Sequence, residues 1–388
     1  IVDDGHLVLT FQRQVQRPIS PGQRVREREE HGEHARGLRK ARGGGNRVAR
    51  GVRLTEDVLS TDDNGLVCAA GGFHVDPWAG PVERAVLTHA HADHARPVMK
   101  HALVAAPGLA IARARLPGVD VEGVAYGERV RLGDVDVSLH PSGHVLGAAQ
   151  VRVEGRDGVW VVSGDYKLAA DPTTTPFTPI ACDVFITEAT YGLPIFRWDP
   201  PATTLADINA WWRAARDEGR PAILYGYTLG KLQRVLAGLD ADIGPIFTHG
   251  AAENMIALYR EAGVALPATK HLQAAPPPGA LVLAPPSAQN TPWAHKITRL
   301  DATSAFCSGW MRIRGLRRRR TVDRGFAFSD HADWPALLEA VRTSRASRVL
   351  VTHGHTTQLA GALVEMLGVD ARVLSTRYEG ELAAESVE

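Results

Sequence analysis

The chain has 388 residues, of which 44% are hydrophobic and 22% are charged, and its formal net charge is +1. This length predicts two or three domains, and the composition is ordinary for a soluble globular protein. The small net charge excludes a global field that would by itself attract nucleic acid, so such a partner needs a local argument.

The cysteines and the hydropathy exclude several classes of protein. Cys68, Cys182 and Cys307 stand far apart and form no Cys-x-x-Cys pair, which argues against a disulfide framework or a thiolate zinc site. We therefore expect a reducing, cytoplasmic location. No apolar run is long enough to predict a membrane span, and the N-terminus lacks the apolar core of a secretory signal.

Residues 1–51 differ from the rest of the chain. The segments 26–30 and 36–42 are dense in charge, and apolar periodicity nearly vanishes after Phe11. Three interpretations stay open: a disordered arm, a basic tail that binds nucleic acid, or upstream DNA translated from a start codon assigned too early. We expect the compact sequence to begin near Val52.

Residues 88–94 read Thr-His-Ala-His-Ala-Asp-His and form the densest group of metal-ligand types in the chain. An apolar stretch at 85–88 predicts a buried strand before them, and 95–99, with a proline near its first turn, predicts a helix after them. Side chains at positions i and i+2 of an extended segment point the same way, so His89 and His91 can bind one metal ion. Asp93 and His94 lie past the bend and can face a second ion.

Further candidate residues follow predicted strands. The strands are expected at 65–72, 73–77, 121–140, 150–153, 159–162 and 183–187. His144, Asp165 and Glu188 each come just past a strand end, where layered α/β proteins place their chemistry. Asp76 either orients a ligand histidine or forms an Asp-Pro turn.

From Leu193 onward, helical and extended patterns alternate. Helices are expected at 205–216, 228–239 and 252–262, and strands at 222–225, 246–249 and 280–284. This alternation predicts a second α/β unit of about 130 residues. Trp211 and Trp212 could stack on bases, but their spacing with Ile208 favours core packing.

The last part of the chain resembles the first part in its order of features. A strand near 325 leads to Asp330 and His331, and a helix follows at 334–343. A strand at 348–352 then ends at His353, and a last helix is expected at 358–367.

The chain has enough ligands for two metal ions. The candidates are His89, His91, Asp93, His94, His144, Asp165 and His353. Zinc accepts histidine and aspartate while it keeps a position open for water, and two ions about 3.5–4 Å apart can clamp a hydroxide and a phosphate oxygen. One carboxylate must bridge the ions, for which Asp165 is the candidate. His74 and His140 are expected to be structural or exposed, and His355 is a competitor of His353.

These motifs resemble a known family. Residues 88–94, 141–144 and 163–165 resemble successive metal motifs of the metallo-β-lactamase fold, and Glu188, His331 and His353 resemble the extra motifs of its β-CASP branch. That branch contains Artemis-like DNA exonucleases, ribonuclease J and the pre-mRNA 3′-end endonuclease. The amino-acid sequence at 70–78, 163–167, 308–311 and 328–334 resembles the bacterial ligase-associated DNA exonucleases more closely still.

The resemblance implies an α/β fold, a four-layer αββα metallo-β-lactamase sandwich with an inserted α/β β-CASP cap domain. The implied division places an extension at 1–51, the first part of the sandwich at 52–191, the cap at 192–325 and the second part of the sandwich at 326–388. The substrate would lie in the cleft between sandwich and cap.

The resemblance also implies roles for the candidate residues. His89, His91 and His144 would hold one Zn²⁺, and Asp93, His94 and His353 the other, with Asp165 between them; Mn²⁺ is an alternative metal. Glu188 would position His331, the candidate general acid, and Asp93 would complete the catalytic set. A histidine cation beside a carboxylate stays protonated near neutral pH, which suits this role.

The implied reaction is hydrolysis of DNA phosphodiester bonds by a hydroxide activated by two metal ions, as exonucleolytic end processing in DNA repair. An ATP-dependent DNA ligase and a helicase are the implied functional partners, with no membrane involved. His353 stands where Artemis-like proteins typically carry an apolar residue, which leaves an RNA-processing β-CASP ribonuclease open. A small-molecule metallo-hydrolase of the same fold and a non-catalytic scaffold are further alternatives.

Two segments are candidates for contacts with the substrate. Thr228 and Lys231 stand at a predicted helix start, whose backbone N–H groups can bind a phosphate. Arg312, Arg314 and the run 317–320 either contact backbone phosphates or form a solvated loop.

Overall fold

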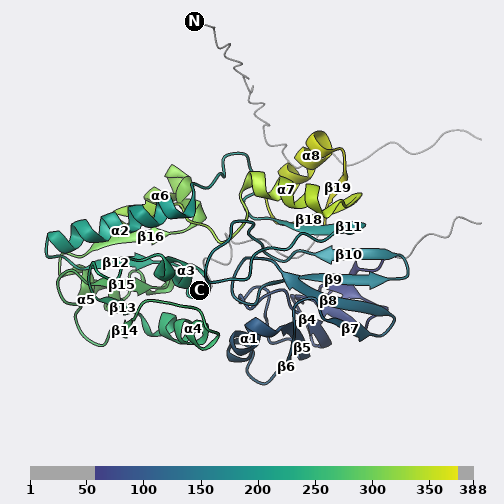
Figure 1. The fold of residues 1–388 in the computed structure, drawn as a ribbon, viewed down its shortest axis with the longest axis horizontal. Coiled ribbons are helices and arrows are strands. Elements are labelled where there is room, and N and C mark those ends of the chain that lie inside the picture. The colour runs from purple at the N-terminus through teal and green to yellow at the C-terminus, as the bar shows by residue number, and fades with distance from the viewer. Residues whose placement is uncertain (1–56, 375–388) are drawn as a thin grey trace, which may run out of the picture. The chain divides into compact units, whose positions relative to one another are not determined.

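The computed structural model describes residues 57–374, all of which belong to the unit Leu54–Glu388 (Figure 1). The predicted extension at 1–51 and the last residues of the chain, 375–388, lie outside the described residues. The described part is a mixed α/β structure with several sheets, as predicted. Among its helices, none has both the length and the apolar character that a membrane span requires.

The first sheet combines antiparallel and parallel strands in the order β1-β2-β3-β4-β5-β6. Its strands are β1 (Ser60–Thr61), β2 (Leu66–Cys68), β3 (Phe73–Val75), β4 (Val82–Val86), β5 (Met99–Ala105) and β6 (Asp120–Val124). Pairing is antiparallel from β1 to β3 and parallel from β3 to β6. A 3₁₀ turn and α1 (Leu109–Arg115) connect β5 to β6.

The second sheet has the order β19-β18-β11-β10-β9-β8-β7. Its strands are β7 (Arg129–Leu132), β8 (Val135–Pro141), β9 (Ala149–Gly155), β10 (Gly158–Val162), β11 (Val184–Ala189), β18 (Arg348–Gly354) and β19 (Asp370–Val373). Strand β9 is antiparallel to both β8 and β10, and β10, β11 and β18 are mutually parallel. The carboxyl ends of β8, β10, β11 and β18 therefore meet at one edge of the sheet.

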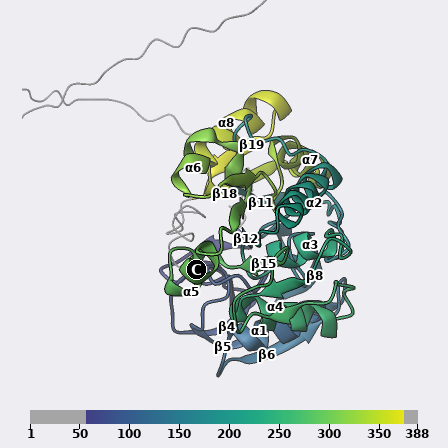
Figure 2. The ribbon, with the colours of Figure 1, turned by 90° about the vertical axis from the view of Figure 1, so that its left-hand side faces the viewer.

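A shared apolar core lies between these two sheets. Phe73 and Val86 of the first sheet and Leu139 and Val151 of the second are buried in one cluster. The other face of the first sheet is covered by α1, and α4 (Gly250–Glu261) packs beside α1 (Figure 1 and Figure 2). The other face of the second sheet is covered by α7 (Trp334–Ser344) and α8 (Thr356–Leu367).

The third sheet is parallel throughout, in the order β14-β13-β15-β12-β16-β17. Its strands are β12 (Ala222–Tyr225), β13 (Ile246–Thr248), β14 (Lys270–His271), β15 (Leu281–Ala284), β16 (Thr303–Cys307) and β17 (Arg324–Phe326). The helices of this part of the chain are α2 (Pro201–Asp217), α3 (Lys231–Ala237), α4, α5 (Pro292–Thr298) and α6 (Arg314–Arg319).

Helices α2, α3 and α4 bury one face of the third sheet, where Trp211 and Trp212 lie in the core. The indole N–H of Trp212 donates to the carbonyl of Gly279 at 3.0 Å. The core interpretation of these tryptophans is therefore confirmed, and base stacking on them is excluded by burial. Helix α4 also packs Tyr259 in one core cluster with α1, and the Tyr259 hydroxyl accepts the N–H of Leu146, in the loop between β8 and β9, at 3.1 Å.

One predicted element is wrong. Residues 95–99 do not form a helix; a loop leads to β5, which begins at Met99. Strand β5 pairs with β4 on one side and β6 on the other, and residues 102–105 are all buried. Pairing on both edges and burial of this apolar run outweigh the local helix signal of Pro97. The remaining predicted strands and helices are present, with ends shifted by a few residues.

Candidate metal centre

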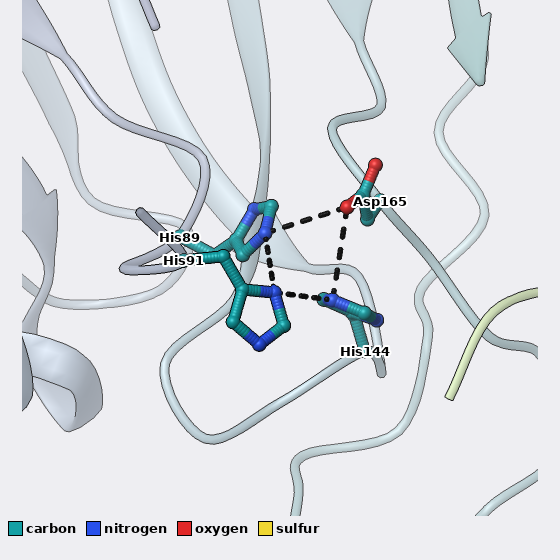
Figure 3. A group of neighbouring side chains, drawn as sticks. All are labelled: His89, His91, His144 and Asp165. Atoms are coloured by element: carbon teal, nitrogen blue, oxygen red, sulfur yellow. Dashed lines mark hydrogen bonds and ion pairs between the residues drawn. The ribbon is translucent and has the colours of Figure 1, made fainter. Parts of the chain in front are cut away.

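Residues that follow three strands converge on one spot (Figure 3). His89 and His91 lie on the loop after β4, His144 follows β8, and Asp165 follows β10. One ligand atom of each residue lies within 4.8 Å of the ligand atoms of the other three. Of the four, His89, His144 and Asp165 are buried and His91 is half-buried.

The distances between these atoms suit a tetrahedral cation. His89 Nε2 and His144 Nε2 lie 3.0 and 3.1 Å from His91 Nδ1, and they lie 3.4 and 3.8 Å from Asp165 Oδ2. Ligands at about 2.0–2.1 Å from a tetrahedral zinc ion would lie about 3.3 Å from one another. Three imidazole nitrogens and one carboxylate oxygen are also a donor set that zinc accepts. This buried group can hold a metal ion.

The outer nitrogens of two of the three rings contact backbone carbonyls. His91 Nε2 donates to the carbonyl of Leu229 at 3.1 Å, and His144 Nδ1 donates to the carbonyl of Asp330 at 2.9 Å. Because a carbonyl oxygen only accepts, the neutral form of each ring carries its lone pair on the inner nitrogen, toward the cluster. Burial lowers the pKa of His89 and His144 well below the usual value, which keeps both rings neutral.

A second group shares the Asp165 carboxylate. His94 Nε2 lies 3.4 Å from Asp165 Oδ2 and 3.9 Å from Asp93 Oδ2, and the His94 and His353 rings stack at 5.3 Å. Burial disfavours the charged form of His94, but the Asp165 and Asp93 carboxylates outweigh burial and raise the pKa of His94 well above its usual value. These carboxylates favour a positive charge here, which a cation would supply.

Asp165 Oδ2 is the atom that both groups share, because it lies within 4 Å of His89, His144 and His94. Asp76 lies behind His94: its carboxylate accepts the N–H of Thr88 at 2.8 Å and contacts His94 Nδ1 at 2.8 Å. Asp76 therefore orients His94, which favours the first of its two sequence-based interpretations.

His353 reaches the second group through an irregular strand end. The register between β11 and β18 shifts at Glu188 and Ala189, and His353 has a positive φ of 55°. Such a bulge turns a side chain away from the regular alternation of the strand. Burial lowers the pKa of His353 to about 4, so this ring also stays neutral at neutral pH.

Glu188 and His331 form a buried pair beside these groups. His331 Nδ1 lies 3.0 Å from Glu188 Oε2 and 3.2 Å from Oε1, and the backbone N–H of Tyr166 donates to the same carboxylate at 2.7 Å. The His331 ring lies 4.5 Å from the His144 ring, and Asp165, Glu188 and His331 together form a further group with metal-ligand spacing. Burial raises the pKa of Glu188, against the opposing effect of His331.

The remaining candidate histidines have other partners. His74 pairs with Asp62 at 2.9 Å, and His140 contacts the Ser138 hydroxyl at 2.9 Å. The ring of His355 lies against Phe196, with 6.1 Å between centroids. The competing ligand His355 thus packs in an aromatic cluster.

A buried charge network that the sequence analysis missed connects α3 to the metal-ligand loops. Lys231 Nζ lies 2.7 Å from Asp330 Oδ2, and Arg234 Nη1 lies 3.2 Å from Asp330 Oδ1. Arg234 also reaches Asp171 at 3.3 Å, and Lys167 contacts the same carboxylate. Burial would raise the pKa of Asp330, but the nearby cations hold it well below its usual range. The only sequence signal is the i, i+3 spacing of Lys231 and Arg234.

We expect Asp330→Asn to lower the free energy of unfolding by about 3–5 kcal/mol, because the buried Lys231 ammonium would lose its counter-charge. Urea unfolding followed by tryptophan fluorescence measures this. The matched control is Asp370→Asn, which removes an exposed carboxylate paired with Arg372; it should cost less than about 1 kcal/mol. Equal stability changes in both variants would contradict a stabilising role of the network.

The residues predicted to contact the substrate differ in their exposure to solvent. Lys231 is buried and paired with Asp330, and the carbonyl of Thr228 accepts the side-chain N–H of Gln233 at 2.8 Å. Arg312 and Arg314 are exposed, and Arg312 lies 3.6 Å from Asp199. Contacts between these residues and a substrate stay a prediction.

The chain is similar to two proteins of known sequence. It is 32% identical over 314 residues to a protein named "Probable DNA ligase" from Opitutus terrae, a match that covers 79% of this chain and 30% of that protein. It is 38% identical over 76 residues to an "Uncharacterized protein in lig 3'region" from Acidianus ambivalens, which covers 19% of this chain and 51% of that protein. The chain thus spans about a third to a half of these relatives. No family model matches it.

Proposed function

We propose that this protein is a metal-dependent nuclease that hydrolyses phosphodiester bonds in DNA. The observation that carries the proposal is the cluster of His89, His91, His144 and Asp165 beside the Glu188–His331 pair. Metal-ligand spacing next to a buried acid–histidine pair supports hydrolysis with a separate proton donor. The likeness to a DNA ligase supports DNA as the substrate.

We assign His89, His91 and His144 to one metal ion, Asp93, His94 and His353 to a second, and Asp165 to both. Two Zn²⁺ ions, or Mn²⁺ in their place, would lower the pKa of a water and neutralise charge on the phosphoryl oxygens. Leu229, Asp330 and Asp76 hold the outer nitrogens of three ligand rings, which keeps the donor atoms aimed inward. Asp93 in addition contributes negative charge that favours the bound cations.

His331 would protonate the leaving oxygen of the departing nucleoside. The Glu188 carboxylate contacts His331 Nδ1, so it can orient the ring and stabilise its charged form. The ring also lies beside His144, which would put it near the reacting phosphate. Glu188 is thus a positioning residue, and His331 is the catalytic acid.

The fold supports placement among the β-CASP nucleases of the metallo-β-lactamase fold, closest to the ligase-associated DNA exonucleases. Two facing sheets with helices on their outer faces suit the αββα sandwich. The parallel sheet of β12 to β17 suits a cap at 192–325, inserted between sandwich parts at 52–191 and 326–388.

Exonucleolytic trimming of DNA ends in repair, in the cytoplasm and together with an ATP-dependent ligase and a helicase, is the proposed role. The match covers only 30% of the ligase, so ligation itself is not carried over. Histidine at position 353 supports a second candidate, an RNA-processing ribonuclease of the same branch. A small ester would not need a second α/β unit beside the metal ligands, which disfavours a small-molecule hydrolase.

The test compares strands of one sequence made as single-stranded DNA, duplex DNA and RNA, each labelled at either end. The full chain is assayed as purified, after chelation, and after Zn²⁺ or Mn²⁺ is restored, with metal analysis of each sample. We expect stepwise shortening of DNA from one end, loss on chelation and recovery with metal. Faster cleavage of RNA would favour the second candidate, and no cleavage of any strand by the metal-loaded protein would contradict the proposal.

A further inference from the structure

An arginine-lined cavity of about 570 Å³ lies beside α6 and includes none of the proposed metal ligands. Four arginines line it, Arg312, Arg317, Arg318 and Arg324, together with Asp199, Asp207 and Asp323. Only some of the arginines in the segment 312–320 therefore face this cavity. Arg314 and Arg319 do not line the cavity, and Arg320 places its guanidinium over the Phe306 ring at 4.4 Å.

The positive charge of the cavity is only partly compensated. Asp323 Oδ2 already accepts the N–H of Ser304 at 2.7 Å and its hydroxyl at 3.0 Å, and Asp199 lies 3.6 Å from Arg312. Arg317 and Arg318 are exposed and form no ion pair with any residue between 57 and 374. Two guanidinium groups are thus available to an anion.

The shape and lining favour a ligand with phosphates and apolar surface. Guanidinium groups bind phosphate oxygens in pairs, which is why arginine is common wherever phosphate is recognised. Met311, Val322 and Phe326 supply apolar lining, and the Arg324 guanidinium lies 5.0 Å from the Phe326 ring. Nucleotides carry both kinds of surface, whereas inorganic anions carry only charge.

The cavity has a neighbour that reaches His331. It shares Asp199 and Ala327 with a second cavity of about 200 Å³, which His331 lines. Ala327 and His331 are four residues apart, so their Cα atoms are at most about 14 Å from each other. Because a stacked strand advances about 3.4 Å per nucleotide, at most about four nucleotides span this distance.

We propose that this cavity binds the phosphodiester backbone of single-stranded DNA within about four nucleotides of the phosphate being cleaved. The inference rests on the proposed function, since it names where the rest of the substrate lies. Arg317 and Arg318 make the strand contacts, and Arg312 and Arg324 add charge at the cavity wall. Substrates too short to reach the cavity gain nothing from it.

The experiment measures binding apart from cleavage. A fluorescent phosphorothioate DNA strand of about 12 nucleotides is titrated by anisotropy at several salt concentrations, because the salt slope counts phosphate contacts. The test variant is Arg317→Ala/Arg318→Ala in the full, metal-loaded chain. The control, Arg299→Ala/Arg342→Ala, removes the same charge from exposed positions outside the cavity. Circular dichroism checks that both variants are folded.

We expect the test variant to bind about tenfold more weakly, with a salt slope shallower by about 1.4, since each lost contact on a single strand contributes about 0.7. The control should bind within twofold of the parent protein. A phosphorothioate dinucleotide, used as a competitor, should bind the test variant, the control variant and the parent protein with equal affinity. Arg318→Ala should also weaken binding of the long strand more than Arg319→Ala, its neighbour outside the cavity.

The inference would be overturned if the test and control variants lost the same affinity for the long strand. It would also be overturned if the test variant lost as much affinity for the dinucleotide as for the long strand. Its failure is distinguishable from failure of the proposed function. A parent protein that cleaves DNA while the test variant binds normally contradicts only the cavity assignment. A parent protein that cleaves no strand, while the test variant still loses binding, contradicts the nuclease proposal and leaves the cavity as a binding site for single-stranded DNA.

Discussion

Asp165→Asn is expected to remove bound metal and to lower DNA cleavage by at least about 10³-fold, or about 4 kcal/mol in activation free energy. The substitution keeps the shape of the side chain but replaces a negative oxygen by a neutral amide. Asp165 Oδ2 lies within 4 Å of His89, His144 and His94, so the loss affects both groups of ligands. Metal content per chain and turnover of end-labelled DNA are measured on the same sample.

The matched control for this variant is Asp157→Asn, in the exposed turn between β9 and β10. It makes the same chemical change on the hairpin that leads to Asp165, and it should leave metal content and turnover unchanged. Urea unfolding of both variants separates loss of the metal from general destabilisation, because a destabilised protein would unfold at a lower urea concentration. Full metal content in Asp165→Asn would contradict the assignment of this carboxylate to the metal centre.

The convergence of the candidate ligands could be anticipated because it depends on strand ends. His89, His144 and Asp165 each follow a segment whose apolar pattern marks a buried strand. The parallel strands β8 and β10 bring His144 and Asp165 to one edge of the second sheet, and β4, which precedes His89, belongs to the first sheet that packs against it. The burial of Trp211 and Trp212 in α2 could also be predicted, since their spacing with Ile208 places all three residues on one face of the helix. Local periodicity sufficed in both cases.

Contacts between distant segments could not be anticipated in this way. The carbonyl of Leu229 holds a ring nitrogen of His91, 138 positions away, and no local pattern encodes that pairing. Arg234 meets Asp171 and Asp330 only after α3 is placed against the loops that follow β10 and β17. The false helix at 95–99 has the same origin, because pairing of β5 with two neighbours decides its conformation.

The contacts between the start of α3 and the ligand loops have a consequence for how the site is assembled. Leu229 and Lys231 belong to the segment that opens α3. The carbonyl of Leu229 contacts the ligand His91, and Lys231 pairs with Asp330, the residue before His331. The orientation of the imidazoles therefore depends on the packing of the third sheet and its helices. A substrate that shifts α3 would also shift the hydrogen bond that orients the His91 ring.

His331→Ala is expected to retain metal and to lower the turnover of DNA by about 10²–10⁴-fold, the range that general acid catalysis contributes. The ring contacts Glu188 and lies beside His144, but it is not among the ligands we assign. The decisive readout is the leaving group: thymidine 5′-(p-nitrophenyl phosphate) releases a stable phenolate that needs no proton. The variant should cleave this substrate nearly as well as the parent protein.

Glu188→Gln should show the same dependence on the leaving group with a smaller loss, because the amide can still orient His331 but cannot stabilise its charge. His101→Ala is the matched control, since this exposed histidine pairs with Asp120 on the first sheet; its turnover on both substrates should equal that of the parent protein. If His331→Ala lost cleavage of DNA and of the p-nitrophenyl ester equally, proton donation would not be its role. Loss of metal in step with activity would instead place His331 among the ligands, together with Asp165 and Glu188.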